Sequence, residues 1–548
     1  MAQRKKSILG ACVEDCIHVA GILGFLQIAE DFGYYTHFMG PAVPVDQLIE
    51  QIKQSEAHMI ALSYRLTPDT GYSIITDFIT RIKEEGLTER SYILGCLPEL
   101  AKKVGKMEFF DHIYTGGETV DDLLPLLRNE STSKLDDSFY PNDLVSRIEF
   151  KQPFPILRAH FGLPSMKKTL KGIETLSKSK ALDVISIAPD QAAQEWLHHP
   201  EVIKTRPQGT GGVPIRKKHD LELLYQASRC GNHPLLRIYS GTQDLIKNSK
   251  WFQETIHNAW AAIPIFWYSE LDGRGPCKLK EAIEEHLNAI KWHAEQNIPV
   301  EINDPHQWGL RMASDRLVVA DAYISARVAK ELGVQTYIEQ LMFNTPTGNS
   351  WKMDLARVLA MVEIVKPLIN DNFKVLRETR AGLAYLVPKP DVAKGQLVAS
   401  TIQQMAVKPH IMHIVSYCEA SHAANPEDII ESCSLLKRVI QDSLQGLPNL
   451  LADKEIQKRK DALIHEAKTI IQEFEDLGRS IGTENPYLSA ETLSEAVRLG
   501  LFDAPHLKGN PAAKAEVKTR IIDGKCIPVS EKIGHGGNEK NQRVKHVK

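Results

Sequence analysis

Long apolar runs are missing from this sequence of 548 residues. None approaches the roughly 18 residues that a membrane-spanning helix needs. The first residues, MAQRKKSILGACVED, are basic and then apolar, as in a secretory signal, but the apolar run spans only about six residues and ends at Glu14 and Asp15. We therefore expect a cytoplasmic protein that is not embedded in a membrane.

An excess of charge of one sign is also missing. The formal net charge is −3, from 66 Lys and Arg against 69 Asp and Glu. Proteins that bind nucleic acid or anionic membranes electrostatically carry a strong basic excess, so neither partner is expected. Hydrophobic residues make up 43% of the chain and charged residues 25%, which is typical of soluble globular proteins. The length predicts about two to four domains.

Cysteine motifs are scarce. The eight cysteines are scattered along the chain, which favours reduced thiols over a disulfide framework. Cys12 and Cys16 form a lone CxxxC, and without a third nearby cysteine an iron–sulfur cluster is not expected. Neither an HExxH motif nor paired CxxC motifs occur, so no zinc site is predicted.

What the sequence does contain is a regular alternation of apolar strands and amphipathic helices. In residues 21–33, for example, Ile22, Leu23, Leu26 and Ala29 recur at helical spacing and are expected to share one face. Short loops between such units indicate a parallel α/β sheet covered on both faces. Five units predict a flavodoxin-like, Rossmann-type domain over residues 1–130. The expected strands are 6–13, 34–40, 57–64, 90–95 and 109–117.

The alternation resumes on a larger scale after residue 150. Residues 131–150 are polar and aperiodic, which is typical of a linker. About eight strand–helix units follow and predict a (β/α)8 TIM barrel over residues 151–475, with a small C-terminal extension over 476–548. The expected barrel strands are 156–161, 183–188, 235–241, 263–270, 299–304, 335–340, 373–379 and 412–417.

Several polar or small residues follow the strands of the first predicted domain. His18 comes after the first strand, Ser63 ends the third, Gly95 ends the fourth, and Gly116 and Gly117 follow the fifth. A lone loop histidine is most often solvent-exposed and without function. Small residues at neighbouring strand ends would, however, leave an open floor for a wide planar ligand, and His18 could then bind a metal through a neutral ring nitrogen.

This pattern resembles the cobalamin-binding domain shared by B12-dependent mutases and methionine synthase. In that family an Asp-x-His-x-x-Gly motif follows the first strand, its histidine is the lower ligand of cobalt, and the displaced nucleotide tail enters a slot lined by a Ser-x-Leu segment and a Gly-Gly pair. The resemblance implies cobalamin as cofactor and His18 as the cobalt ligand. The matching positions are His18, Gly21, Ser63, Leu66, Gly95, Gly116 and Gly117.

The match has two departures. Cys16 stands where the family has the aspartate that hydrogen-bonds the axial histidine, and a thiol is a weak acceptor. The segment SYRL stands for Ser-x-Leu, and Gly95 is followed by Cys96 instead of a second glycine. Cys16 remains a predicted neighbour of the cofactor, with a different influence on the histidine–cobalt bond.

The predicted barrel is similar to the large subunit of glutamate mutase (methylaspartate mutase) over roughly residues 155–525. The resemblance implies that Arg158 binds a substrate carboxylate, Glu270 a substrate ammonium group, and Glu419 the adenosyl ribose. The chain thus resembles both glutamate mutase subunits fused in one polypeptide, with the small subunit first.

The substrate positions depart from that family. Glutamate mutase holds its dicarboxylate with three arginines, and only Arg158 is kept here. The second position falls near Asp190 and Gln191, and the third on Tyr239, with Arg237 two residues away on the same strand face. Neither Tyr nor Gln reproduces bidentate arginine pairing. At roughly 1.5–3 kcal/mol per charge-assisted bond, glutamate binding would lose several kcal/mol, so we expect another carboxylic or amino acid as substrate.

Other segments leave alternatives open. His306, Trp308 and Arg311 could line the top of the barrel or belong to a structural loop, and Arg377 and Arg380 could form an anion clamp or a solvated ion pair. The glycine-rich GTGGVPIRKKHD lacks the Gly-Lys-Ser/Thr ending of a phosphate-binding loop.

The leading hypothesis is an adenosylcobalamin-dependent radical carbon-skeleton mutase, with a homodimer formed through the barrel. A corrinoid methyltransferase and a non-catalytic cobalamin carrier or sensor are the alternatives.

Overall fold

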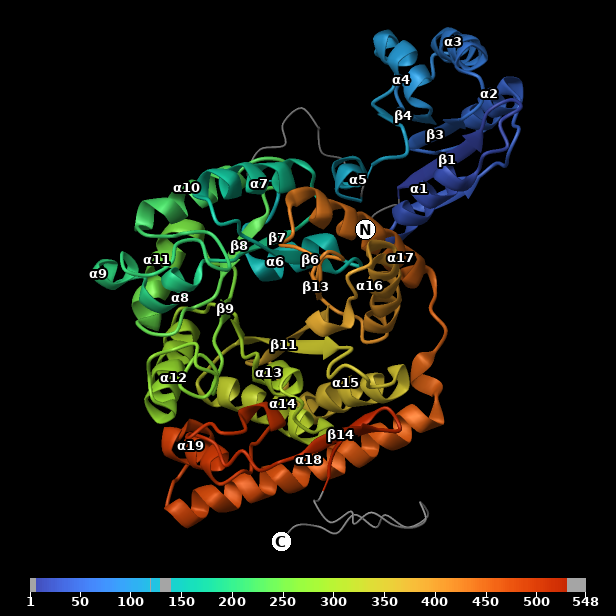
Figure 1. Ribbon diagram of the computed structural model, residues 1–548. Helices are drawn as coiled ribbons and strands as arrows, with labels where there is room; N and C mark the ends of the chain where they lie inside the picture. The colour runs from blue at the N-terminus through green and yellow to red at the C-terminus, as the bar shows by residue number, and fades with distance from the viewer. Residues whose placement is uncertain (1–5, 119, 129–138, 530–548) are drawn as a thin grey trace. The chain divides into compact units, whose positions relative to one another are not determined.

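The computed structural model describes residues 6–118, 120–128 and 139–529, and the chain divides into two compact units, Met1–Phe139 and Tyr140–Lys548 (Figure 1). Each unit is described by itself. Residues 131–138 of the predicted linker and 530–548 of the predicted extension lie outside the described residues.

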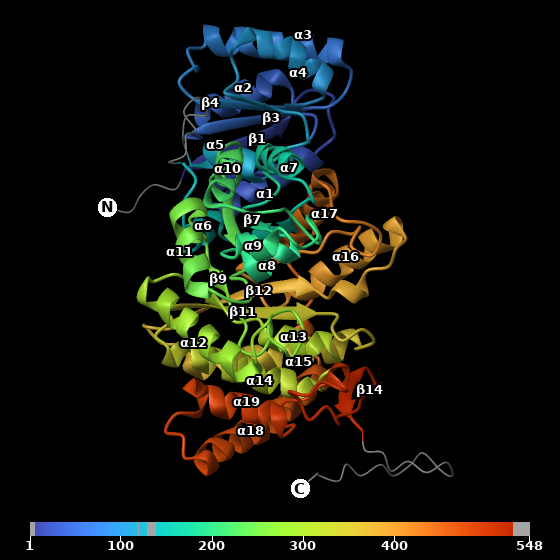
Figure 2. The same ribbon diagram turned by 60° about the vertical axis from the view of Figure 1, so that its left-hand side comes forward.

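The first unit is built on a five-stranded parallel sheet in the order β2-β1-β3-β4-β5. This is the strand order of flavodoxin-like domains, and the predicted fold class is confirmed. Figure 2 shows α2, α3 and α4 on one side of the sheet and α1 and α5 on the other. The strands are β1 Ser7–Cys12, β2 Tyr35–Phe38, β3 Met59–Tyr64, β4 Ser91–Cys96 and β5 His112–Tyr114; the helices are α1 Ala20–Asp31, α2 Val45–Gln54, α3 Pro68–Glu84, α4 Pro98–Val104 and α5 Val120–Leu127.

The first helix departs from the expected apolar face. Ile22, Leu26 and Ala29 are buried as predicted, but Leu23 is 43% exposed and Ile28 takes its place in the core. Leu23 therefore belongs to an apolar surface near the start of the helix.

The second unit is a nearly closed barrel of eight parallel strands. Seven ladders join the strands in the order β8-β7-β6-β13-β12-β11-β10-β9, while β8 and β9 share no ladder. The predicted TIM-barrel architecture is thus confirmed. The strands are β6 Ile156–Phe161, β7 Val184–Ile187, β8 Leu235–Ile238, β9 Ala261–Ala262, β10 Val300–Glu301, β11 Thr336–Phe343, β12 Lys374–Ala381 and β13 Ile411–Ile414.

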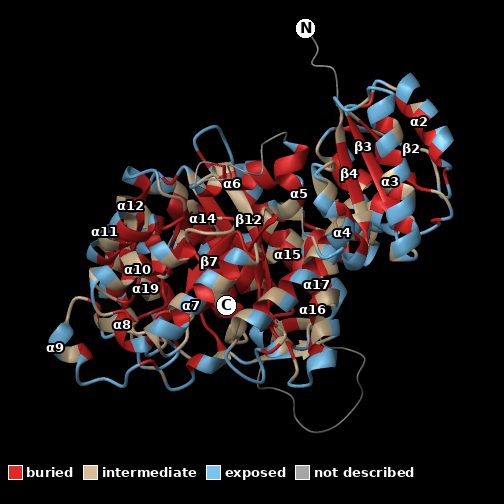
Figure 3. Ribbon diagram, turned by 90° about the horizontal axis from the view of Figure 1, so that it is seen from above, coloured by how far each residue is buried: buried red, intermediate tan, exposed pale blue. Residues whose placement is uncertain are grey.

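Helices follow the strands and cover the outside of the barrel. In Figure 3 the strand β7 is buried, whereas the surrounding helices alternate buried and exposed faces, as amphipathic helices do. The helices are α7 Met166–Lys178, α8 Gln191–Trp196, α9 Pro200–Ile203, α10 Lys218–Ser228, α11 Leu245–Ile256, α12 Leu279–Glu295, α13 Asp304–Leu310, α14 Asp315–Glu331, α15 Trp351–Val365, α16 Pro390–Met405 and α17 Pro426–Gln445.

One expected strand is mostly irregular backbone. Residues 263–270 were expected to form a strand from their apolar character, but β9 comprises only Ala261–Ala262. The backbone N–H groups of Ile265 and Phe266 donate to the buried carboxylate of Asp304 at 2.5 and 2.9 Å. A side chain thus satisfies donors that a ladder would otherwise use, so the segment stays buried without strand pairing.

Two segments outside the strand–helix repeats pack against the barrel unit. Helix α6, Leu144–Lys151, lies within the range expected to be a linker, and its buried Arg147 donates to the carbonyl of His233 at 2.9 Å. Helix α18, Lys454–Ile481, continues past the expected boundary at residue 475 and packs on α14 and α15 (Figure 2). Helix α19, Ala490–Arg498, and the hairpin β14 Thr519–Ile522 and β15 Lys525–Pro528 follow.

Within the described residues, no helix is both long enough and apolar enough to cross a membrane.

Candidate functional site

The carboxyl edge of the five-stranded sheet carries a row of small residues. The register aligns Cys12 of β1 with Ser63 of β3, Ser63 with Gly95 of β4, and Gly95 with Tyr114 of β5. At Gly95 an added Cβ would meet only the Leu62 carbonyl oxygen, at 3.7 Å. Space for a ligand therefore remains beside this row.

His18 lies at this edge, in the loop between β1 and α1. Its backbone carbonyl accepts a hydrogen bond from the Cys12 thiol at 3.7 Å. The residue is exposed, and no group among the described residues hydrogen-bonds its imidazole. Ile17 is 65% exposed, and a Cβ added at Gly21 would meet nothing within 4 Å. The His18 imidazole therefore has open, partly apolar surroundings.

Cys16 lies in the same loop, two residues before His18. It is fully buried, and its sulfur accepts a hydrogen bond from the backbone N–H of Arg65 at 3.3 Å. This bond ties the β1–α1 loop to the loop after β3. Burial, and then the neighbouring Cys16, raise the pKa of the Cys12 thiol to about 11, so Cys12 stays protonated at neutral pH.

The loop after β5 adjoins the loop after β3. Gly116 adopts a φ of +95°, which favours glycine, and the Glu118 carboxylate accepts from the backbone N–H groups of Thr115 and Gly116, each at 2.7 Å. A Cβ at Gly116 would lie 4.0 Å from the Arg65 guanidinium, whereas one at Gly117 would meet nothing within 4 Å. Leu66 packs against the core of this unit.

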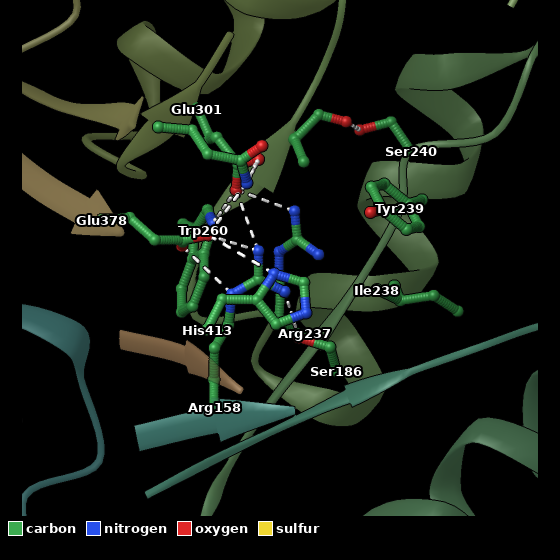
Figure 4. A network of polar contacts seen from close by, with 12 residues as sticks. Arg158, Ser186, Arg237, Ile238, Tyr239, Ser240, Trp260, Glu301, Glu378 and His413 are labelled. Atoms are coloured by element: carbon green, nitrogen blue, oxygen red, sulfur yellow. Dashed lines mark hydrogen bonds and ion pairs between the residues drawn. The ribbon is translucent and has the colours of Figure 1, made fainter. Parts of the chain in front are cut away.

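The barrel interior holds a layer of paired charges (Figure 4). Arg158 of β6 binds the Glu378 carboxylate of β12 through Nε at 3.0 Å and Nη2 at 2.5 Å, and donates to Ser186 Oγ at 3.0 Å. All atoms of Arg158 and Glu378 are buried. The predicted carboxylate anchor is therefore already engaged by a carboxylate of the protein.

A second pair lies in the same layer. Arg237 Nη2 donates to Glu301 Oε2 at 2.8 Å, and Trp260 Nε1 donates to the same oxygen at 2.7 Å. Gln340 Nε2 links the two pairs, at 3.0 Å from Glu301 and 2.9 Å from Glu378. The positive charges of the two guanidinium groups are thus balanced by the negative charges of the two carboxylates. Arg237 Nε and Nη1 remain without hydrogen-bond partners.

Two residues further along three of these strands, side chains form a layer nearer the carboxyl ends. His160 follows Arg158, Tyr239 follows Arg237, and Arg380 follows Glu378, so each shares the inward face of its strand. The Tyr239 hydroxyl lies 3.1 Å from His160 Nε2.

Histidine rings gather around this layer. His160 and His413 lie with ring centroids 4.8 Å apart. Burial, followed by the nearby arginines, holds the pKa of His160, His306 and His413 well below the usual range. These three rings are neutral at neutral pH and can donate or accept hydrogen bonds.

Arg380 has no counter-ion. It is 6% exposed, and neither a hydrogen bond nor an ion pair joins it to any described residue. Burial lowers the pKa of its guanidinium, and Tyr239, Arg158, Glu378 and Glu419 contribute to its electrostatic surroundings. Arg377, three residues earlier, lies on the other face of β12, beside Glu339 of β11. The two arginines therefore do not form one clamp.

Glu270, predicted to hold a substrate ammonium group, accepts from the backbone N–H of Leu279 at 3.0 Å and pairs with Lys278 at 2.7 Å. Tyr268, two residues earlier, adopts a φ of +64° and packs against Tyr239 with ring centroids 6.2 Å apart. Non-glycine residues held in this region often occur at functional sites.

The residues whose roles the sequence left open have the following surroundings. His306 lies in α13 and is electrostatically close to Arg380, while Trp308 is fully buried in an aromatic cluster. Arg311 donates to Gln307 Oε1 at 2.8 Å. The glycine-rich segment belongs to a structural network, because Asp190 accepts from the Gly209 backbone N–H and pairs with Arg216.

Glu419 is exposed in the loop after β13. Beside it, ligand atoms of Cys418, His422 and Asp428 lie within 4.8 Å of one another, and His422 Nε2 is 3.0 Å from Asp428 Oδ2. Such a thiol, imidazole and carboxylate could hold a transition metal. The spacing matches none of the zinc motifs sought in the sequence.

Sequence reasoning missed His160, His413 and the internal partners of Arg158 and Arg237. The signal for His160 was its i, i+2 spacing from Arg158. The carboxylate partners gave no local signal, since Glu378 lies 220 residues from Arg158.

Comparison with known proteins gives partial likenesses only. No protein-family model matches the sequence, and no curated protein matches it. A cobalamin-binding protein from Desulfitobacterium hafniense DCB-2 is similar at 24% identity over 20% of this chain and 53% of that one, with a TM-score of 0.18. This chain thus spans about half of that protein.

Two further solved structures cover more of the chain. 2,3-Dimethylmalate lyase, a member of the PEP mutase/isocitrate lyase superfamily, is 10% identical over 58% of this chain and 94% of its own, with a TM-score of 0.27. The cobalamin-dependent S-adenosylmethionine radical enzyme OxsB is 12% identical over 89% of this chain and 64% of its own, with a TM-score of 0.18. At these scores neither establishes a family, and the fold rests on the strand order and register.

Proposed function

We propose that the protein is an adenosylcobalamin-dependent mutase that rearranges the carbon skeleton of a small carboxylic or amino acid other than glutamate. The observation that supports it most is the exposed imidazole of His18, without a hydrogen-bond partner, beside the row Cys12, Ser63 and Gly95. The motif resemblance and this geometry agree on the same residues. A cytoplasmic location and a homodimer stay predictions.

The residues of the first unit fit cobalamin in three respects. His18 offers a ring nitrogen that could bind cobalt. The open space at Gly95 and Gly117 suits a nucleotide tail, and exposed Ile17 and Leu23 offer apolar surface to a corrin. Cys16 differs, because its sulfur is engaged by the Arg65 backbone. Its influence on His18 would therefore act through the loop and not through a direct hydrogen bond.

In the barrel unit, the residues would bind and orient the substrate and exclude water. Bound adenosylcobalamin would supply the radical that removes a hydrogen atom from the substrate. Tyr239 and His160 would contact the substrate as neutral hydrogen-bonding groups. Arg158 and Arg237 would position them from the layer beneath, fixed by Glu378 and Glu301.

Two predicted roles concern carboxylates of the barrel unit. Glu419 is exposed, which is compatible with a contact to the adenosyl ribose. Glu270 would have to leave Lys278 and the Leu279 N–H to bind a substrate ammonium group, so its assignment stays a prediction.

The test is anaerobic spectroscopy of the protein loaded with adenosylcobalamin and offered a panel of small carboxylic and amino acids. The proposal expects one acid to trigger an EPR signal and an isomerised product. The same panel with methylcobalamin tests a corrinoid methyltransferase, which would demethylate the cofactor and give no such signal.

A cobalamin carrier or sensor is the second candidate. It is favoured by the internal pairing of Arg158 with Glu378 and of Arg237 with Glu301, because each arginine already has a carboxylate of the protein as its counter-ion. Tight binding of adenosylcobalamin, with neither signal nor product across the panel, would support the carrier and contradict the mutase.

A further inference from the structure

The barrel interior contains a buried guanidinium that neither hydrogen-bonds nor ion-pairs with any described residue. In the central layer, Arg158 and Arg237 are matched by Glu378 and Glu301. Arg380 lies two residues beyond Glu378, is 6% exposed, and has neither hydrogen bond nor ion pair within the described part of the chain. Burying an uncompensated charge is costly, so this arrangement indicates an anion that binds from outside.

Neighbouring polar groups are also unsatisfied. Both side-chain polar atoms of Asn303 and the Nδ1 atoms of His306 and His413 are buried without hydrogen-bond partners. The strand register aligns Arg380 of β12 with His413 of β13. Asn303 is the N-cap residue of α13, the helix that carries His306, and Arg380 is among the charges that lower the pKa of His306. Several orphaned buried polar groups around one free guanidinium are typical of a ligand site.

The other arginines nearby are engaged. Arg274 binds the Asp272 carboxylate through Nε at 2.7 Å, and Arg311 donates to both oxygens of Gln307 at 2.8 and 3.0 Å. Arg380 is therefore the one guanidinium among the described residues of this region that lacks any partner. A ligand bound there could pair one anionic group, and not two, with a free arginine.

We infer that Arg380 binds the carboxylate of a small acid with a single anionic group, and that the orphaned Asn303 amide and the neutral histidine rings bind a second, uncharged polar group. This deepens the proposed function, because it moves the substrate anchor from Arg158 to Arg380 and names the substrate class. Planar guanidinium–carboxylate pairing supplies the orientation.

The experiment is isothermal titration of the cobalamin-free protein with butanoate, 2-aminobutanoate, butanamide and glutarate. At least one of the two monocarboxylates should bind saturably, butanamide should not bind, and glutarate should bind no more tightly than the better monocarboxylate. Arg380→Met should weaken monocarboxylate binding at least tenfold, and Arg380→Lys should retain part of it. Arg377→Met, on the opposite face of the same strand, is the matched control and should bind like the wild type.

Thermal unfolding of the same variants separates a binding role from a structural one. Removing an unbalanced buried charge should raise the midpoint of ligand-free Arg380→Met above that of the wild type. The inference is overturned if Arg380→Met binds the acids like the wild type, whatever its unfolding midpoint, if no acid in the panel binds the wild type, or if glutarate binds tenfold more tightly than either monocarboxylate. Because cobalamin is left out, failure of cofactor binding would not affect this result.

Discussion

Arg158 and Glu378 meet across the barrel interior, with Nε and Nη2 of the guanidinium 3.0 and 2.5 Å from the two carboxylate oxygens. Both side chains are fully buried. A folded protein loses far less stability when both partners of such a buried bidentate pair are replaced than when only one of them is replaced.

We therefore expect Arg158→Met to lower the free energy of unfolding by about 3–5 kcal/mol, because Glu378 would remain buried and unpaired. Denaturant unfolding of Arg158→Met, Glu378→Gln and the double variant measures this coupling. The double variant should recover a large part of the loss. If the double variant instead lost the sum of the two single-variant free energies, the two side chains would not depend on each other for stability.

Buried carboxyl groups predict how stability changes with pH. Asp321 of α14 has two buried oxygens without partners, and burial, followed by Asp304, raises its pKa well above the usual range. Burial raises the pKa of Asp304 to about 7. The folded state therefore holds more protons than the unfolded state above the unfolded pKa of about 4, so stability should fall as the pH rises from there through the raised folded values.

Asp321→Asn should reduce the loss of stability that occurs as the pH rises. We expect its unfolding midpoint to fall less between pH 5 and pH 8 than that of the wild type, with the larger advantage at pH 8. Asp391→Asn, at an exposed position in the first turn of α16, is the control and should follow the wild type. Parallel midpoint curves for wild type and Asp321→Asn would contradict the account.

The small-residue row at the sheet edge can be filled without disturbing the fold. An added Cβ at Gly95 meets only an ordinary contact, so Gly95→Val should fold, while its branched side chain would enter the space assigned to the nucleotide tail. We expect adenosylcobalamin affinity, measured by equilibrium dialysis, to fall at least tenfold. Gly24→Ala, where a Cβ meets nothing within 4 Å, should bind like the wild type; equal affinities for all three proteins would rule out the slot.

Much of the fold could be predicted from the sequence, because strands buried on both faces read as continuous apolar segments between amphipathic helices. Strand β6 coincides with the expected range 156–161. The failure at 263–270 has a specific cause: the Asp304 carboxylate, from a later segment, satisfies the backbone there. Apolar character showed burial at that place but not the hydrogen-bonding partner.

The candidate site was predictable only in part. The positions of His18, Ser63 and Gly95 follow from where strands end, which the alternation shows. The availability of a charged side chain does not follow from such a pattern. The sequence predicts a substrate anchor at Arg158, but Glu378 engages that guanidinium. For Arg380 the sequence allows an anion clamp or a solvated ion pair, whereas the side chain is buried without a partner.

The most direct test of the account is the absorption spectrum and affinity of the purified protein with adenosylcobalamin, compared among wild type, His18→Ala and His37→Ala, where His37 is an exposed histidine of the same unit. Ligation by His18 predicts a protein-bound cofactor after gel filtration, an affinity at least tenfold lower and an altered spectrum for His18→Ala, and no change for His37→Ala. A wild-type protein that emerges colourless, or a His18→Ala variant with unchanged affinity and spectrum, would contradict it.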